Sequence, residues 1–266
     1  MRVATFNVLH GRSLLDGLVA ADRLARACAS LDADVVCLQE IDRGQPRSGG
    51  LDQTAAVAEA LGAAAWRFEA ALVGEPGARW RPATDDDERG GEPAYGVGIV
   101  SRRPVVGWRV LRLAAARVRS PVAAPGGRGG MILLADEPRV ALAATLEGPS
   151  GPLEVATTHL SFVPGHNVRQ LRRLGRELGT SPGAVLAGDL NLPRAVVGPA
   201  LAGLGWRSLV RAATFPAAEP RFQLDHVLAR GPVGRVVGSG TVVLDLSDHR
   251  AVVVELAAGG DGYRRR

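Results

Sequence analysis

Polar side chains follow short apolar runs at six places along this 266-residue chain. Such runs are typical of buried strands, so each polar side chain is expected at a strand end. The positions are Asn7, Glu40, His159, Asp189 with Asn191, Asp225 with His226, and Asp248 with His249. Carboxylate and amide oxygens are the ligands of a hard cation such as Mg²⁺ or Mn²⁺, whereas zinc sites use more imidazole or thiolate. The set predicts a metal ion combined with acid and base groups.

Each of these residues alone would be an ordinary turn or structural residue. The set carries more weight, because the chain has only three asparagines and five histidines, and Asn7, Asn191, His159 and His249 all belong to it. The other three histidines, His10, His166 and His226, are expected to be structural or peripheral. Among these, His10 is the strongest candidate for a site role, because it follows Asn7 by three residues.

The elements that position these residues are mostly strands. Apolar runs predict strands at 2–8, 34–39, 96–101, 105–111, 131–134, 139–146, 153–158, 184–187, 222–228, 233–244 and 251–256. Helical spacing predicts helices at 19–31, 52–61 with Asp52 as its N-cap, 167–178 and, more briefly, 195–204. Strands that outnumber helices, with helices in both halves, favour a layered α/β sandwich over a barrel of alternating units.

Two segments, 74–93 and 114–130, are expected to be surface loops, and neither is long enough to indicate a second domain. We therefore predict one domain over residues 1–257. Residues 258–266, which end in three arginines, are expected to form a flexible tail.

The composition excludes some chemistry. All 32 basic residues are arginine, so a lysine Schiff base and a phosphate-binding loop with its lysine are both ruled out. The formal net charge of +5 falls to about +2 without the three terminal arginines, which is only a weak argument for a polyanionic partner.

Cys28 and Cys37 are expected to be small buried side chains in a reducing compartment, because two cysteines make a poor disulfide framework. No stretch reaches the ~20 apolar residues that span a bilayer. A first strand at Arg2 leaves no room for a signal peptide. These features predict a soluble, cytoplasmic protein with no transmembrane segment.

The ordered motifs resemble those of one large family. They are Thr5-Phe6-Asn7, Leu38-Gln39-Glu40, Thr158-His159-Leu160, Gly188-Asp189-Leu190-Asn191, Leu224-Asp225-His226-Val227 and Ser247-Asp248-His249-Arg250. In this order they resemble the endonuclease/exonuclease/phosphatase superfamily, which includes pancreatic deoxyribonuclease, neutral sphingomyelinases and inositol polyphosphate 5-phosphatases. The resemblance implies a deoxyribonuclease-I-like fold, a four-layer α/β sandwich of two stacked mixed β-sheets flanked by helices.

The resemblance also implies roles for individual residues. Glu40 would be the principal Mg²⁺ ligand, with Asn7 close by. Asp189 would orient or deprotonate the attacking water, and the choice between Asp189 and His249 as general base stays open. His249, polarised by Asp248, would bind the phosphate.

Further roles follow for the remaining motif residues. Asn191 and His159 would contact phosphate oxygens, and Asp225 would support the water and the metal. One strand of the family carries an asparagine where this chain has Val97, but the arginine that follows the strand is retained here as Arg102. The resemblance implies that Arg102 binds substrate. Arg43 would do the same at the mouth of the site, where Arg47 and Asp52 are also expected. The equal alternative for these three residues is an ordinary solvated loop.

The function implied is a Mg²⁺-dependent phosphoesterase, with Mn²⁺ as a substitute, that hydrolyses a phosphate ester by direct attack of an activated water. The substrate class stays open between nucleic acid, phospholipid and inositol phosphate, and no stable protein partner is implied. One alternative is an endonuclease or exonuclease acting on DNA, suggested by the arginine-rich face of the 167–178 helix. Another is a non-catalytic phosphate-binding protein on the same fold.

Overall fold

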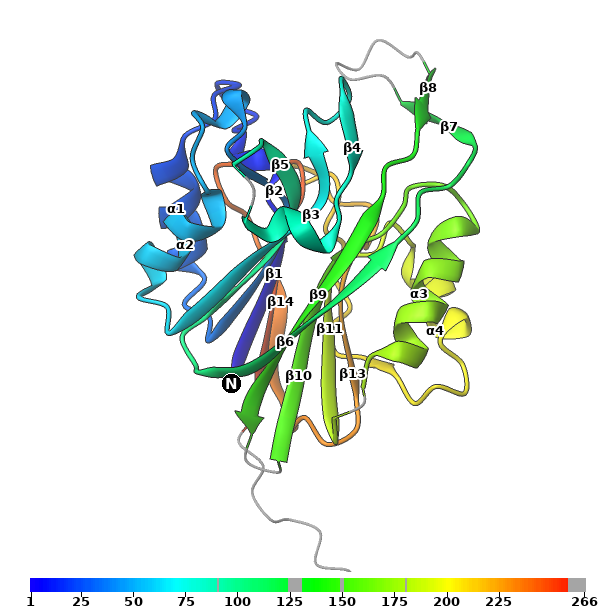
Figure 1. The fold of residues 1–266 in the computed structure, drawn as a ribbon. Helices are drawn as coiled ribbons and strands as arrows, with labels where there is room; N and C mark the ends of the chain where they lie inside the picture. Colours follow the sequence, from blue (N-terminus) through cyan, green and yellow to red (C-terminus); the bar gives the residue numbers. More distant parts are fainter. Residues whose placement is uncertain (90, 124–130, 149–150, 180, 258–266) are drawn as a thin grey trace, which may run out of the picture.

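A computed structural model describes residues 1–89, 91–123, 131–148, 151–179 and 181–257 of the chain. Two β-sheets lie face to face, with helices on their outer sides (Figure 1). The predicted tail, 258–266, lies outside the described residues.

The first sheet has seven strands and is mixed. Its order is β14 (Val236–Val242), β15 (Ala251–Leu256), β1 (Arg2–Asn7), β2 (Val35–Arg43), β5 (Ala94–Ser101), β3 (Ala65–Gly74) and β4 (Trp80–Pro82). Strands β1 and β2 are parallel, and the other neighbours are antiparallel. The parallel pair therefore ends at one edge, above the N-terminus in Figure 1.

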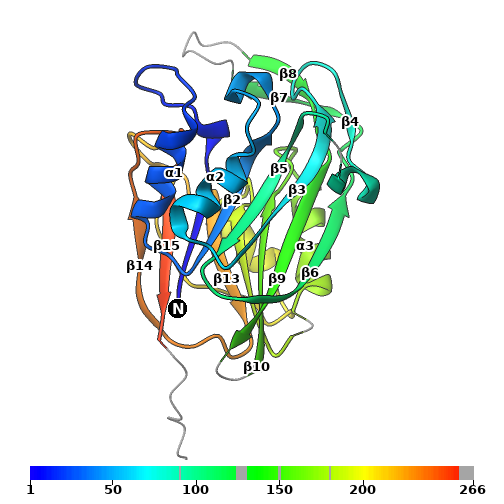
Figure 2. The same ribbon diagram turned by 60° about the vertical axis from the view of Figure 1, so that its left-hand side comes forward.

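The second sheet has six strands and repeats this arrangement. Its order is β12 (Arg207–Ser208), β13 (Asp225–Arg230), β11 (Gly183–Asp189), β10 (Gly151–His159), β9 (Arg139–Gly148) and β6 (Val105–Leu113). Only β10 and β11 are parallel. A separate hairpin of β7 (Arg119–Ala123) and β8 (Met131–Ala135) lies beyond the upper ends of the strands in both ribbon views (Figures 1 and 2).

Four α-helices in the described part of the chain complete the layers. Helices α1 (Ala21–Ser30) and α2 (Gln53–Leu61) cover the first sheet, and α3 (His166–Glu177) and α4 (Arg194–Ala200) cover the second (Figure 1). Three short 3-10 turns occur at Leu9–Gly11, Pro46–Ser48 and Asp85–Arg89. One apolar core fills the space between the two sheets. A second core lies between the first sheet and its helices, and a third lies between the second sheet and its helices. The predicted four-layer α/β sandwich is confirmed.

Local predictions agree closely with these elements, and Asp52 caps α2 by accepting from the backbone N–H groups of Thr54 and Ala55. The strand β3 was missed, because its alanine-rich segment lacks the β-branched pattern on which strand prediction relies. The predicted loop 74–93 contains β4 and a 3-10 turn. The predicted loop 114–130 contains β7, and its residues 124–130 lie outside the described residues.

Among the described residues, no helix is long and apolar enough to cross a membrane.

Candidate active site

Strand direction gathers the polar strand ends of both sheets at a single edge of the sandwich. The parallel strands β1 and β2 end near Asn7 and Glu40, and the parallel strands β10 and β11 end at His159 and Asp189. His159 and Asp189 are register partners, and Asp225 opens the antiparallel strand β13 directly opposite Asp189. A cluster assembled from both sheets results.

A β-bulge in its strand sets the direction of the Glu40 carboxylate. The register between β2 and β5 shifts between Gln39 and Ile41, so Glu40 is the extra residue of a β-bulge, and its φ is +54°. A bulge with left-handed backbone redirects one side chain out of the regular alternation and costs backbone strain, a combination found often beside active sites. The bulge lets Glu40 lie at the sheet edge beside Asn7.

Gly188 allows Asp189 to lie close to its neighbouring strand. A Cβ at position 188 would lie 2.1 Å from the Thr158 carbonyl oxygen on β10, so only glycine fits. The carboxylate that follows is 98 % buried and accepts a hydrogen bond from the backbone N–H of Asn191 at 2.9 Å. Asn191 itself has a φ of +48°, a conformation that asparagine tolerates better than most residues.

Asn7 joins the two sheets within the site. Its Nδ2 donates to Glu40 Oε1 at 3.0 Å and to Asp189 Oδ2 at 3.0 Å, and its Oδ1 accepts from the backbone N–H of Leu9. Since all three hydrogen bonds fix the amide orientation, Asn7 holds the carboxylates of Glu40 and Asp189 in a defined relation.

His249 is held by Asp225. Its Nδ1 lies 2.8 Å from Asp225 Oδ2, its Nε2 lies 3.8 Å from Asp189 Oδ2, and the ring of Phe215 covers it with centroids 4.9 Å apart. The carboxylate that bonds the ring is therefore Asp225, and Asp248, which was predicted to polarise it, raises the His249 pKa only through its charge. This bond also changes the role predicted for Asp225, whose contact with His249 orients the imidazole.

The charge of His249 follows from these contacts. Burial lowers its pKa, but the carboxylates of Asp225 and Asp189 outweigh burial and raise it to about 10. Burial raises the pKa of Asp189, and the His249 imidazolium counters that effect. At neutral pH His249 is therefore a cation that faces the Asp189 carboxylate.

His159 has different neighbours. Its Nε2 lies 3.0 Å from Asn191 Nδ2, and its Nδ1 lies 3.4 Å from a guanidinium nitrogen of Arg139. Burial lowers the pKa of His159 well below its usual range, and the charges of Arg139 and His249 lower it further, although Asp189 Oδ2 is only 3.5 Å away. His159 is therefore a neutral imidazole at neutral pH.

Glu40 and Asn7 are the residues best suited to hold a metal ion. Burial raises the pKa of the Glu40 carboxyl, a cost that a bound cation would offset. Asp189, Asp225 and His249 also offer ligand atoms within 4.8 Å of one another. However, the Nδ1 of His249 already contacts Asp225 Oδ2. The carboxylate oxygens of Glu40 fit a hard divalent cation, and the Nδ2 of Asn7 holds this carboxylate from one side.

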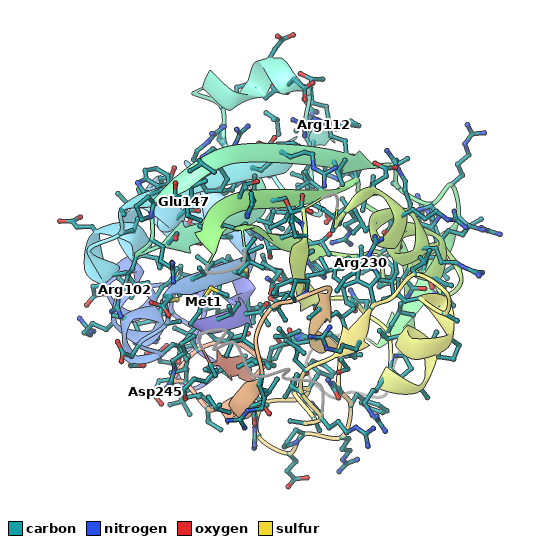
Figure 3. The ribbon with its side chains drawn as sticks, turned by 90° about the horizontal axis from the view of Figure 1, so that it is seen from below. Met1, Arg102, Arg112, Glu147, Arg230 and Asp245 are labelled. Atoms are coloured by element: carbon teal, nitrogen blue, oxygen red, sulfur yellow. The ribbon has the colours of Figure 1, made fainter. Side chains whose placement is uncertain are left out.

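Arg102 lies at the opposite end of the sandwich. Strand β5 runs antiparallel to β2, so Arg102 follows it at the lower edge, near Met1 in the view from below (Figure 3). There it forms an ion pair with Asp32 at 2.6 Å and donates to the Leu61 carbonyl. The predicted role of Arg102 in substrate binding is therefore wrong, because the sequence motif does not reveal the direction of its strand.

Arg43 and Arg47 lie just beyond Glu40, as predicted, and both have partners. The Arg43 guanidinium lies over the Phe68 ring and donates to the Asp87 carbonyl. Arg47 forms a two-point ion pair with the fully buried Asp42 carboxylate. Substrate binding by Arg43 stays a prediction.

The three remaining histidines differ in their surroundings. His226 is fully buried and bonds the Leu192 carbonyl, and His166 bonds the Ala114 carbonyl, so both serve structure. Burial and the charge of Arg47 lower the pKa of His10 to about 4, which makes it a neutral ring at the mouth of the site.

Sequence patterns missed two polar residues near the site. Arg139 contacts His159, and it is 94 % buried at the start of β9. Tyr95 is buried on β5, and burial together with the charge of Glu40 raises its pKa well above 10. The one available signal for Arg139 was a charged residue placed directly before the apolar run at 140–146.

Two stacked mixed sheets thus bring carboxylates, amides and imidazoles together at one edge of the sandwich. A family model for the endonuclease/exonuclease/phosphatase family matches residues 4–249, so the chain belongs to this family. Members are hydrolases that act on phosphate esters and generally use a divalent metal. No curated protein sequence matches the chain significantly.

Solved structures agree with the family. A protein described as endonuclease/exonuclease/phosphatase from Beutenbergia cavernae is 26 % identical, with a TM-score of 0.70 over 98 % of this chain and 72 % of that one. Sphingomyelinase C from Streptomyces griseocarneus is 20 % identical, with a TM-score of 0.58 over 96 % and 98 %. TDP2 from D. rerio, complexed with a single-strand DNA product, is 18 % identical, with a TM-score of 0.57 over 96 % and 97 %. The last two share the fold.

Proposed function

We propose that the protein is a Mg²⁺-dependent phosphoesterase that hydrolyses a phosphate ester by direct attack of an activated water molecule. One observation carries the proposal: the Asp189 carboxylate lies between Asn7, which also holds Glu40, and the cationic His249. This arrangement supports a proposal in which a divalent cation and an anionic substrate would bind on either side of one potential base.

Glu40 and Asn7 would hold the metal ion. When bound, Mg²⁺ would neutralise charge on the phosphoryl oxygens and assist the departing oxygen. Mn²⁺ has similar ligand preferences and should substitute.

Asp189 would orient the attacking water and accept its proton. Its Oδ1 is occupied by the Asn191 N–H, and its Oδ2 faces both Asn7 and the Nε2 of His249. A protonated His249 cannot accept a proton, which favours Asp189 over His249 as the general base. A carboxyl whose pKa is raised by burial is also a better base near neutral pH.

His249 would bind the phosphate and stabilise the negative charge that grows in the transition state. The ion pair with Asp225 keeps the ring protonated and its Nε2–H directed into the site. Asn191 and His159, which contact each other through groups that carry no charge, would contact a further phosphoryl oxygen.

Hydrolysis of bis(4-nitrophenyl) phosphate tests the proposal. Activity is expected with Mg²⁺ or Mn²⁺ and should be lost in EDTA. A phosphate-release screen over inositol phosphates, phospholipids and nucleotides would then assign monoester or diester specificity. If none of these substrates is hydrolysed in either metal, the proposal is wrong, and binding without turnover would favour a phosphate-binding protein.

A second candidate, nuclease activity on DNA, is favoured by helix α3. Arg169, Arg172, Arg173 and Arg176 are all exposed on it. The helix begins beside the site, where Asn167 donates to the Asn191 carbonyl. Nicking of supercoiled plasmid with a steep salt dependence would support this function, and it should weaken when two of the arginines are replaced by glutamine. The cytoplasmic location and the absence of a stable protein partner stay predictions from the sequence.

A further inference from the structure

A cavity of about 420 Å³ opens beside the candidate active site, between the outer strands of the two sheets. Its wall is formed chiefly by Ala71, Trp80, Ala83, Leu113, Pro138 and Arg139. These residues come from β3, β4 and the residue after it, β6, and the start of β9 with the proline before it; the four strands lie together in Figure 1. The volume falls within the range of about 300 to 1,000 Å³ that is typical of small-molecule sites.

Arg139 connects this cavity to the active site. One guanidinium nitrogen lies 3.4 Å from His159 Nδ1, and another lies 3.6 Å from Asp136 Oδ1. Its Nε is buried and has no hydrogen-bond partner among the described residues, and the whole residue is 6 % exposed. The Arg139 side chain therefore lies packed between the cavity and His159 and forms the wall of the cavity on the side of the active site.

The other charged groups of the cavity are already paired. Arg112 forms ion pairs with Glu69 at 2.7 Å and Asp85 at 2.9 Å, and Arg173 pairs with Glu177 at 2.7 Å. The rest of the wall is alanine, proline, leucine and the half-buried Trp80. Since the paired arginines leave little free positive charge, the wall suits an uncharged ring better than a second phosphate.

We propose that this cavity binds an aromatic group of the substrate, which packs against Trp80 and the apolar wall. The inference rests on the proposed function, because Arg139 and His159 place the cavity one side chain away from the phosphate site. The substrate would then be a phosphate ester in which an aromatic group lies a short distance from the reacting phosphorus.

Calorimetric titration with two phosphonates that cannot be hydrolysed tests the inference. 4-(4-Nitrophenyl)butylphosphonate and n-butylphosphonate share a head group and a chain, and they differ in the aromatic ring with its nitro acceptor. In Mg²⁺ the full-length protein should bind the nitrophenyl compound about tenfold more tightly, as expected for a buried and stacked ring.

Two variants locate the ring, and a third serves as a control. Trp80→Ala removes the aromatic wall and Ala115→Leu narrows the cavity, so each should reduce the affinity ratio to about twofold or less. Trp66→Ala changes an exposed tryptophan at the other end of β3 and should leave the ratio unchanged. Equal affinities in the wild type, no binding of the nitrophenyl compound, or a ratio unaffected by both cavity variants would overturn the inference.

Hydrolysis of bis(4-nitrophenyl) phosphate by the same preparations separates this inference from the proposed function. Turnover with an affinity ratio near one would contradict the aromatic subsite and still support the phosphoesterase. A tenfold ratio without turnover of any phosphate ester would support the binding site and contradict the enzymatic function.

Discussion

His159 and His249 occupy similar positions but differ in charge. Each is a buried imidazole at the polar edge of the sandwich, His159 on the second sheet and His249 just before a strand of the first. His249 faces the carboxylates of Asp225 and Asp189, whereas His159 faces the Arg139 guanidinium and the Asn191 amide. Burial alone would make both rings neutral, so the neighbouring groups decide which becomes a cation.

The two rings should therefore differ in their effect on catalysis. Replacing His249 by alanine removes a cation that faces the substrate, and activity on bis(4-nitrophenyl) phosphate should fall by about 10³-fold or more. His159→Ala removes a neutral hydrogen-bonding group and should cost about 10- to 100-fold. Steady-state kinetics on both variants measures the difference. Equal losses would mean that charge does not distinguish the two histidines.

Replacing Asp225, the carboxylate that bonds His249, should have the next largest effect on activity. Asp225→Asn keeps the shape of the side chain but removes the charge that holds the imidazolium, so kcat should fall by about 10²-fold. Asp248→Asn should cost about tenfold or less, because Asp248 acts on the site only at longer range. If Asp248→Asn were the more damaging change, the assignment of Asp225 as the orienting carboxylate would fail.

Titration of the metal-free protein should separate the rings directly. His249 should stay protonated until the pH approaches about 10, and His159 should stay neutral well below pH 6.5, as followed by ¹⁵N NMR of the imidazoles.

The raised pKa of His249 determines how the free energy of unfolding changes with pH. The ion pair with Asp225 contributes fully below the unfolded pKa of 6.5, and its contribution is lost as the pH rises through about 10. Urea denaturation from pH 7 to pH 10 should show a fall in stability that is smaller in His249→Gln. An equal fall in both proteins would contradict the pairing.

The smallest effect is expected far from both histidines. Arg102→Ala breaks a largely exposed ion pair at the lower end of the molecule, so stability should change by less than about 1 kcal/mol and activity by less than about twofold. The control is Arg139→Gln, which lies next to His159 and should reduce activity. A large loss of activity in Arg102→Ala would restore the original prediction for that residue.

Strand ends could be predicted from the sequence, because an apolar run followed by a polar residue is a local pattern. A layered α/β sandwich also followed from local patterns, and its four layers were implied by the resemblance to the endonuclease/exonuclease/phosphatase family. Contacts between distant segments could not be predicted, and His249 shows why. Its neighbour in the chain is Asp248, but the backbone turns through a left-handed residue at Ser247, and the ring meets Asp225 instead. Adjacency in the sequence does not fix the direction of a side chain.

Strand direction was a second limit. Arg102 follows β5 and Glu40 lies in the second half of β2, yet these paired strands are antiparallel, so the two residues lie at opposite edges. The position of Arg139 beside the cavity could not be predicted for a related reason, because the cavity forms where segments at 71–83, 112–115 and 138–139 pack together. Which distant segments pack together depends on the topology of both sheets, and no single segment of the sequence determines that topology.

The central claim is that Glu40 binds a divalent cation at the edge of the sandwich where the polar side chains gather. The most direct measurement is the rate of bis(4-nitrophenyl) phosphate hydrolysis against Mg²⁺ concentration for the wild type, for Glu40→Gln and for Glu59→Gln, an exposed carboxylate on α2. The rate of the wild type and of Glu59→Gln should rise and saturate with Mg²⁺. Glu40→Gln should lose about 10²-fold or more in rate and need far more metal. A Glu40→Gln protein with wild-type rate and metal dependence would contradict the claim.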